Sequence, residues 1–215
     1  MRIIDMDGII FDLDGTLWDS TEAVATAWNI ALEQKTNLER HVTGKELRGL
    51  FGKPLEEIFT NLFPDMNREE LMKMVKVLYE YQHQYLESHP CGLYDNVEQV
   101  MRELAKKYPL FIVSNCQAGY IEVFLKATGL GDVITDHTCP GDTGEFKAEN
   151  IRSIMKKNQL EHVVYVGDTG GDKKACDKAQ VPMIFAEYGF GNVREPWMTI
   201  QKFEELLNID YEKLI

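Results

Sequence analysis

Two short acidic runs carry the residues of this chain whose types and spacing suit chemistry. Asp12 and Asp14 stand in a Phe-Asp-Leu-Asp-Gly-Thr run, and Asp168 and Asp172 stand in a Gly-Asp-Thr-Gly-Gly-Asp run. Each run follows apolar residues typical of a buried strand. Clustered carboxylates repel one another, so either their pKa values must rise or a cation must bind. Carboxylates without histidine or cysteine are ligands that Mg²⁺ prefers, and the pattern therefore favours a magnesium ion among these four aspartates.

A hydroxyl group and a lysine are expected at the same place. Ser114 and Asn115 directly follow an apolar run, and Lys147 begins a predicted helix. In open sheets of parallel strands, ligands bind beyond the carboxyl ends of the strands, where these residues would converge with the aspartates. A lysine, a hydroxyl and a metal ion together stabilise the charge of a phosphoryl group, so the pattern predicts phosphoryl transfer. A single aspartate after a strand is usually a turn or cap residue, and only the convergence indicates a site.

A second Asp-x-Asp-Gly run, which contains Asp5 and Asp7, serves as an internal control. It lacks the threonine, and it precedes the apolar residues 9–11 instead of following them. Because the position of a carboxylate relative to the strand decides at which edge of the sheet it lies, we expect no functional role for this run.

The order of the predicted elements indicates how the chain brings the acidic runs together. After a first strand, only helices are predicted up to about residue 88, and from residue 95 helices and strands alternate. This alternation indicates right-handed crossovers and a doubly wound parallel sheet. We therefore predict an α/β core formed by residues 1–17 and 90–215, interrupted by an all-helical insertion at 18–89. The expected strands are 9–11, 110–113, 133–135, 163–166 and 182–185, and the expected helices are 20–35, 43–50, 54–62, 67–87, 96–107, 120–128, 147–157, 173–179 and 197–207.

Composition and charge exclude several classes of protein and partner. The 215 residues include 23 basic and 35 acidic side chains, and the net charge of −12 argues against nucleic acid or an anionic membrane as the partner. The four cysteines are isolated, so neither a zinc site nor a disulfide framework is expected. No apolar run approaches the ~18 residues of a membrane span, and the amino terminus lacks the apolar segment of a secretion signal. We therefore expect a cytoplasmic protein that acts on a small molecule.

Taken in order, these motifs resemble the four motifs of the haloacid dehalogenase superfamily of phosphohydrolases, and the resemblance covers essentially the whole chain. The run around Asp12 is similar to the first motif, Ser114 to the second, Lys147 to the third, and Asp168 with Asp172 to the fourth. The helical insertion resembles the C1-type cap of the phosphoglycolate phosphatase-like and β-phosphoglucomutase-like groups. The implied fold is a Rossmann-like parallel sheet with an inserted all-helical cap domain.

The resemblance implies catalytic and metal-binding roles for the aspartates. Asp12 would attack phosphorus and form an aspartyl-phosphate, while Asp14 would protonate the leaving alcohol and then take a proton from the hydrolytic water. Mg²⁺ would bind the Asp12 carboxylate, the Asp14 backbone carbonyl and Asp168. Asp172 would be a further ligand or a hydrogen-bond partner of the ligands.

The resemblance also implies which residues bind the substrate. Ser114 and Lys147 would hold the transferring phosphoryl oxygens, where charge stabilisation contributes most. Arg48 and Lys53 stand where the superfamily's cap often sends a loop toward the active site, so that either could bind a second anionic group. The expected substrate-binding set is Thr16, Arg48, Lys53 and Asn115.

The implied function is that of a Mg²⁺-dependent phosphatase of a small phosphorylated metabolite, monomeric or homodimeric. Dehalogenation is disfavoured, because dehalogenating members lack an acid at the Asp14 position and need no metal. A mutase similar to β-phosphoglucomutase stays open, since it shares the motifs and the cap. A phosphonate hydrolase would need a cap lysine for a Schiff base, such as Lys35, Lys45 or Lys53. A phosphoacceptor signalling domain is the alternative outside enzymes, but it has no use for a helical lid.

Overall fold

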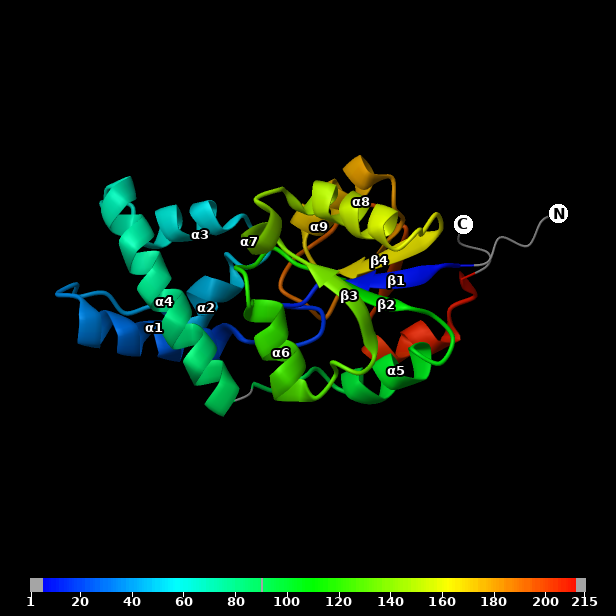
Figure 1. Ribbon diagram of the computed structural model, residues 1–215, viewed down its shortest axis with the longest axis horizontal. Helices are drawn as coiled ribbons and strands as arrows, with labels where there is room; N and C mark the ends of the chain where they lie inside the picture. Colours follow the sequence, from blue (N-terminus) through cyan, green and yellow to red (C-terminus); the bar gives the residue numbers. More distant parts are fainter. Residues whose placement is uncertain (1–5, 90, 212–215) are drawn as a thin grey trace.

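Six parallel strands form one sheet in the computed structural model, which describes residues 6–89 and 91–211. The strands are β1 (Gly8–Phe11), β2 (Leu110–Val113), β3 (Ile134–Thr138), β4 (Val163–Gly167), β5 (Met183–Ala186) and β6 (Met198–Ile200). Their order is β3-β2-β1-β4-β5-β6, so the first strand lies inside the sheet and later strands are added on both sides of it (Figure 1). This order confirms the predicted doubly wound parallel sheet.

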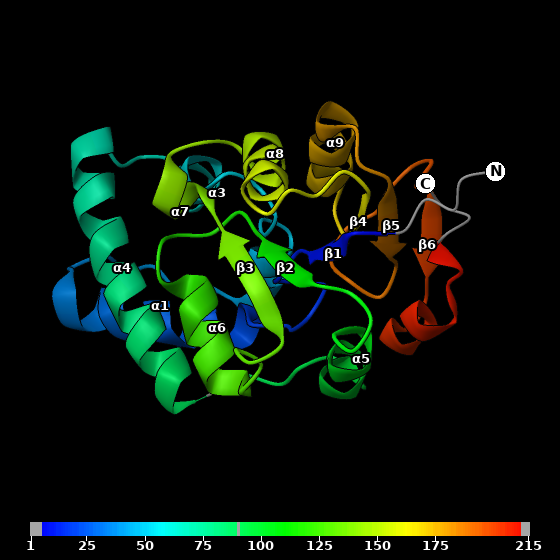
Figure 2. The same ribbon diagram turned by 45° about the vertical axis from the view of Figure 1, so that its right-hand side comes forward.

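Helices cover both faces of this sheet. One face carries α5 (Val97–Leu104) and α6 (Tyr120–Thr128), and the other carries α8 (Lys147–Lys157) and α9 (Gly170–Ala179), as Figures 1 and 2 show. Successive strand residues point to opposite faces. Ile9 accordingly belongs to the apolar cluster on the side of α5 and α6, whereas Ile10 packs with residues of α8 and α9. Apolar residues thus fill both faces, and the polar site residues are left at the strand ends.

Of the five helices that the structure describes between β1 and β2, the first four lie together beyond one end of the sheet (Figure 1). They are α1 (Thr21–Lys35), α2 (Gly44–Arg48), α3 (Leu55–Leu62) and α4 (Arg68–Ser88), and we call them the cap helices. Trp28 of α1 packs against Phe59 of α3 with ring centroids 5.1 Å apart, and α4 packs against both α1 and α6. The division of the chain into two domains stays a prediction, and its limit at residue 90 lies outside the described residues.

The predicted helix at 197–207 is wrong. Its residues form the strand β6 and a short 3-10 helix, η1 (Phe203–Asn208). β6 pairs in parallel with β5 and thereby satisfies backbone groups that would otherwise stay unpaired at the edge of the sheet. The β-branched residues Thr199 and Ile200 suit a strand, and this pairing prevails over the helical spacing of the apolar residues.

Smaller differences concern the start of one helix and the presence of a short additional helix. α9 begins at Gly170, three residues before the predicted start, because Thr169 caps it. A short helix, α7 (Pro140–Thr143), has no counterpart among the predicted elements. None of the helices in the described ranges combines the length and the apolar character needed to cross a bilayer.

Asp7, the described aspartate of the control run, lies at the other end of β1 from Asp12. The carboxylate of Asp7 accepts hydrogen bonds from the backbone N–H groups of Glu161 and His162, each at 2.7 Å. Asp7 precedes β1 and Asp12 follows it, so the two lie at opposite edges of the sheet. Asp5 lies outside the described residues.

Replacing a buried leucine of α4 tests the packing of the cap helices. Leu78 is fully buried, and Leu78→Ala is expected to lower the free energy of unfolding by about 2–5 kcal/mol, because it leaves a cavity. Met72, on the same helix, is 52% exposed. Met72→Ala is therefore expected to change the free energy of unfolding by less than about 0.5 kcal/mol. Urea denaturation measures both values, and similar losses in the two variants would contradict this packing.

Candidate active site

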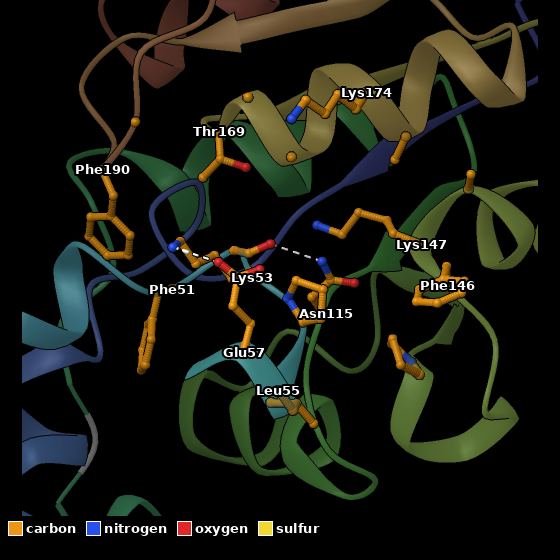
Figure 3. Close-up of a pocket in the computed structure, with 18 of the residues that line it drawn as sticks. Phe51, Lys53, Leu55, Glu57, Asn115, Phe146, Lys147, Thr169, Lys174 and Phe190 are labelled. Atoms are coloured by element: carbon orange, nitrogen blue, oxygen red, sulfur yellow. Dashed lines mark hydrogen bonds and ion pairs between the residues drawn. The ribbon is translucent and has the colours of Figure 1, made fainter. Parts of the chain in front are cut away.

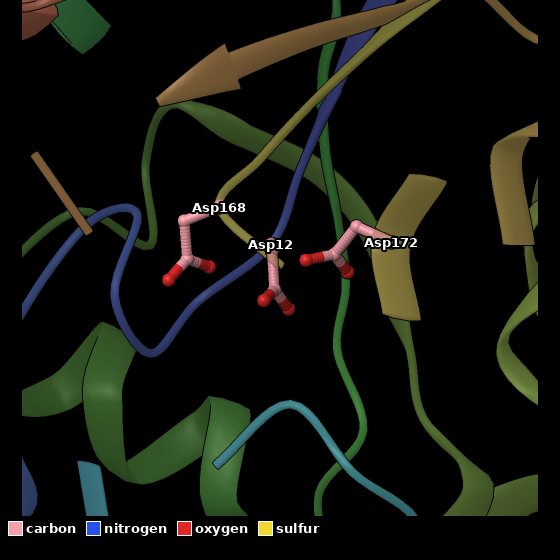
Figure 4. A group of neighbouring side chains, drawn as sticks. All are labelled: Asp12, Asp168 and Asp172. Atoms are coloured by element: carbon pink, nitrogen blue, oxygen red, sulfur yellow. The ribbon is translucent and has the colours of Figure 1, made fainter. Parts of the chain in front are cut away.

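The carboxyl ends of three neighbouring strands bring the chemistry-bearing residues to one edge of the sheet. Asp12 follows β1, Ser114 follows β2 and Asp168 follows β4, and β1 pairs in parallel with both of the other strands. Lys147 is the first residue of α8, and Asp172 lies in the first turn of α9. One carboxylate oxygen from each of the three aspartates lies within 4.8 Å of the others, and all three side chains are buried (Figure 4).

The ammonium group of Lys147 lies between two of these carboxylates. Its Nζ donates to Asp12 Oδ1 at 2.9 Å and to Asp172 Oδ1 at 2.5 Å. Burial by itself lowers the pKa of Lys147, but the two carboxylates outweigh this effect, so the pKa is raised and the ammonium stays charged. Burial also raises the pKa of Asp12 to about 6, although the charge of Lys147 opposes the shift. Lys147 therefore offsets part of the negative charge buried here.

The remaining negative charge makes the three aspartates a candidate metal centre. Burial and the charges of Asp172 and Asp12 raise the pKa of Asp168 well above its usual range. A proton or a cation relieves such repulsion. The donor set that the described residues form here consists of carboxylate oxygens, without histidine or cysteine, and this chemistry fits a hard divalent cation.

Hydrogen bonds hold the two carboxylates of the fourth motif in place. Asp172 Oδ2 accepts from the Thr169 backbone N–H at 2.9 Å and from its hydroxyl at 2.6 Å, within a capping box that starts α9. Asp168 accepts from the Phe190 backbone N–H at 2.7 Å and from the Thr16 hydroxyl at 3.3 Å. Thr16 is fully buried and lines neither cavity beside the site. In this structure the Thr16 hydroxyl binds Asp168, and the predicted contact of Thr16 with the substrate stays a prediction.

Two hydroxyl groups that sequence reasoning missed bind Asp14. Ser20 Oγ donates to Asp14 Oδ1 at 2.5 Å, and the Tyr120 hydroxyl donates to the same oxygen at 2.9 Å. Burial raises the pKa of Asp14 to about 7, against the lowering effect of these hydrogen bonds. A carboxyl group with a pKa near neutrality can both give and take a proton at physiological pH. Ser20 carries a sequence signal, because it stands directly before α1 and shortly after the first motif, although its side chain makes no capping hydrogen bond. No local pattern connects Tyr120 with Asp14.

Two cavities adjoin the site. The inner cavity, of about 30 Å³, is lined on the side of the sheet by Asp12, Asp14 and Ser114. The outer cavity, of about 690 Å³, is lined by Lys147 and by residues of α9 and of the loop between α2 and α3 (Figure 3). Asn115 borders both cavities, and its side-chain N–H donates to the Gly52 backbone oxygen at 2.9 Å. This hydrogen bond joins the second motif to the loop between α2 and α3.

The two cap cations predicted to bind substrate line the outer cavity and not the inner one. Arg48 forms an ion pair with Asp19. Lys53 forms an ion pair with Glu57, with 2.7 Å between Nζ and Oε1 (Figure 3). Lys35 and Lys45, the other lysines considered for a Schiff base, are likewise absent from the lining of the inner cavity. The structure therefore separates the cap cations from the catalytic candidates Asp12 and Asp14.

The doubly wound parallel sheet holds buried carboxylates and a lysine at its carboxyl edge, next to an inserted set of helices. These features together define an α/β enzyme with an acidic centre. More narrowly, the chain belongs to the haloacid dehalogenase-like hydrolase family, whose model matches residues 9–186. This match confirms the resemblance that the four motifs indicate, and it makes the chain an enzyme of the hydrolase class.

Similar proteins agree with this family membership. The chain is 26% identical to a phosphoglycolate phosphatase of Vibrio vulnificus, over 94% of this chain and 94% of that protein. It is 27% identical to a phosphoglycolate phosphatase of Colwellia psychrerythraea, over 96% of this chain and 98% of that protein. The solved structure of a haloacid dehalogenase-like family hydrolase from Streptococcus pneumoniae has a TM-score of 0.80 and 22% identity, covering 94% of this chain and 97% of that one. The structural similarity supports the same fold.

Gly15 allows the turn of the first motif to pass beside Asp168. Its φ is +86°, and a Cβ at this position would overlap the Asp168 carboxylate. Gly15→Ala is therefore expected to cost about 1–3 kcal/mol from backbone strain and a further ~1–3 kcal/mol from the overlap. Gly129 has a φ of +69° with open space around it, so Gly129→Ala is expected to show the strain alone. Urea denaturation measures both losses, and equal losses would contradict this placement of Asp168.

Proposed function

We propose that this enzyme is a Mg²⁺-dependent phosphatase that hydrolyses a small phosphorylated metabolite through an aspartyl-phosphate at Asp12. The observation that carries the proposal is the double contact of Lys147 with Asp12 and Asp172, beside Asp168, at the carboxyl edge of the sheet. A carboxylate nucleophile, a fixed cation and an acidic cluster around one point are what phosphoryl transfer requires. The relatives named as phosphoglycolate phosphatases support a phosphate ester as the substrate.

Asp12 supplies the nucleophile. Its backbone N–H donates to the Val166 oxygen at 2.8 Å, which anchors Asp12 to β4, and Lys147 binds one of its carboxylate oxygens. Because the pKa of Asp12 is about 6, its carboxylate is mostly ionised at neutral pH. A carboxylate oxygen forms the new bond to phosphorus while the bond to the alcohol oxygen breaks. Lys147 and Ser114 offset the negative charge of the phosphoryl oxygens during this step.

Asp14 supplies and then takes the proton. Ser20 and Tyr120 hold Oδ1 of Asp14, which leaves the other oxygen to face the leaving group. Protonated Asp14 gives its proton to the departing alcohol oxygen in the first step. In the second step it takes a proton from the water that attacks the aspartyl-phosphate, and inorganic phosphate and free Asp12 result. A pKa of about 7 suits both transfers.

Asp12, Asp168 and the Asp14 backbone carbonyl would hold Mg²⁺. When bound, the ion supplies positive charge that offsets the repulsion between the carboxylates and the phosphate. Both oxygens of Asp172 already accept hydrogen bonds from side chains or backbone of this chain, one of them from Lys147. These contacts favour a role for Asp172 in orienting Lys147 over a role as a direct ligand.

The cap helices control access to Asp12. A cavity of about 30 Å³ has room for about two water molecules, which is too small for a phosphate ester. The substrate therefore enters after the cap helices move away from the sheet. When they return, they exclude bulk water while the phosphoryl group is transferred to Asp12.

Two alternatives remain to be compared with the phosphatase. Family membership favours an enzyme over the phosphoacceptor signalling domain. A phosphosugar mutase is the enzymatic alternative, and incubation with β-glucose 1-phosphate and its 1,6-bisphosphate separates the two. A mutase yields glucose 6-phosphate, whereas a phosphatase releases inorganic phosphate.

The cytoplasmic location and the monomeric or homodimeric state stay predictions.

Removal of the nucleophile tests the mechanism. Asp12→Asn is expected to lower kcat for 4-nitrophenyl phosphate by at least about 10⁴-fold, because an amide oxygen forms no stable bond to phosphorus. Asp65→Asn, which changes an exposed aspartate of the cap helix region, is the matched control and is expected to keep the wild-type rate. Equal rates for Asp12→Asn and the control would contradict an attack by Asp12.

Removal of divalent metal tests the magnesium requirement. Treatment with EDTA is expected to stop phosphate release, and excess Mg²⁺ is expected to restore it. Mg²⁺ is also expected to raise the thermal midpoint of unfolding, because an ion that binds only the folded state stabilises that state. Asp168→Asn is expected to weaken both effects of Mg²⁺. Full activity after EDTA treatment and dialysis would contradict the proposed magnesium requirement.

A further inference from the structure

The cap-side wall of the inner cavity carries no charged side chain among the residues that the structure describes. It consists of Gly52 and the apolar residues Trp28, Phe51, Leu55, Ile58 and Phe59, with two polar residues whose side chains are uncharged, Tyr79 and Gln82. Asp12, Asp14 and Ser114 lie opposite this wall. In the proposed reaction the phosphoryl group lies against Asp12, so the alcohol half of the substrate meets the cap-side wall when the cap helices close.

Tyr79 offers this wall an unpaired hydroxyl group. Its oxygen is buried and has no hydrogen-bond partner within the described ranges of the chain. The ring packs edge-on against Phe59, with centroids 5.5 Å apart, so the hydroxyl is carried on a fixed aromatic body. A buried hydroxyl without a partner is unfavourable, and a ligand group that binds it removes this penalty.

Gln82 is the second polar group of the wall. Its Oε1 accepts a hydrogen bond from Trp28 Nε1 at 2.9 Å, and its side chain is buried. Because the oxygen is engaged by Trp28, the amide N–H is the group that Gln82 can offer to a ligand. Tyr79 and Gln82 together recognise neutral hydrogen-bonding groups and supply no positive charge.

A carboxylate on the alcohol half would lack a partner at this wall. The cap cations identified from the sequence, Arg48 and Lys53, line the outer cavity and are already paired with acidic side chains. The ionised carboxylate of Asp12, which also lines the inner cavity, would repel a second negative charge. Burying an unpaired carboxylate between apolar side chains is strongly unfavourable.

We propose that the substrate is the phosphate monoester of an uncharged alcohol, with a small apolar body and a hydrogen-bonding group that meets Tyr79. This inference rests on the proposed function and narrows its substrate class. Phosphoglycolate carries a carboxylate on its alcohol half. The proposed substrate therefore differs from the one for which the similar phosphoglycolate phosphatases are named.

A matched pair of esters tests the charge of the alcohol half. 2-Phosphoglycolate and its amide have nearly the same shape and differ by one negative charge. With Mg²⁺ present, kcat/KM for the amide is expected to exceed that for 2-phosphoglycolate by at least about tenfold. An equal or higher kcat/KM for 2-phosphoglycolate overturns this inference and leaves the phosphatase intact. No release of phosphate from either ester or from 4-nitrophenyl phosphate overturns the proposed function, and the inference with it.

The variant Tyr79→Phe tests the hydrogen-bonding group. Glycerol 1-phosphate and propyl phosphate differ by the hydroxyl groups of the alcohol, and the wild type is expected to prefer the former. In Tyr79→Phe, the ratio of kcat/KM for glycerol 1-phosphate to kcat/KM for propyl phosphate is expected to fall by about tenfold. Because the hydroxyl has no partner in the described part of the chain, its removal is not expected to impair folding.

Tyr94→Phe is the matched control for Tyr79→Phe. The Tyr94 hydroxyl is also buried and without a partner in the ranges that the structure describes, but it lies outside the inner cavity. Tyr94→Phe is therefore expected to keep the wild-type preference. An unchanged ratio in Tyr79→Phe, or an equal loss in Tyr94→Phe, overturns the assignment of Tyr79 to substrate recognition.

Discussion

The close approach of three buried carboxylates is the constraint on which the rest of this structure depends. Asp12, Asp168 and Asp172 come from three segments of the chain, and their charges repel one another where water is excluded. Lys147 binds two of them, and the Thr169 capping box fixes one of these while it starts α9. Parallel strands and right-handed crossovers bring the strand ends and the helix starts to the same edge, so the fold supplies both the charges and the groups that offset them.

Charge is distributed unequally over the walls of the inner cavity. The sheet side carries the aspartates, whereas the described cap-side lining is apolar or neutral. The cap cations Arg48 and Lys53 face the outer cavity, where acidic neighbours pair with them. In the proposed enzyme, the core therefore performs the phosphoryl chemistry, and the cap helices select the alcohol by shape and by neutral hydrogen bonds. A protein with a net charge of −12 can bind a phosphate ester in this way, because the cationic groups act locally.

The sequence predicted the parts of the fold that depend on local patterns. The strand predicted at 110–113 has the bounds of β2, and the helix predicted at 120–128 has the bounds of α6. The helix predicted at 197–207 is wrong, because pairing with the edge of β5 outweighs local spacing. The Thr16 hydroxyl binds Asp168, 152 residues away, which no local pattern could indicate.

By itself, the sequence determined the family, the doubly wound sheet and the motifs that carry the acidic residues, because apolar periodicity, capping residues and strand-end positions are properties of short segments. Only the tertiary structure decided which groups hold Asp14, since Tyr120 reaches it across 106 residues. It also decided that Arg48 and Lys53 lie outside the inner cavity and that the Tyr79 hydroxyl is left without a partner among the described residues. These outcomes depend on how distant faces pack against one another, and packing is settled by the shape and charge of all the neighbours together.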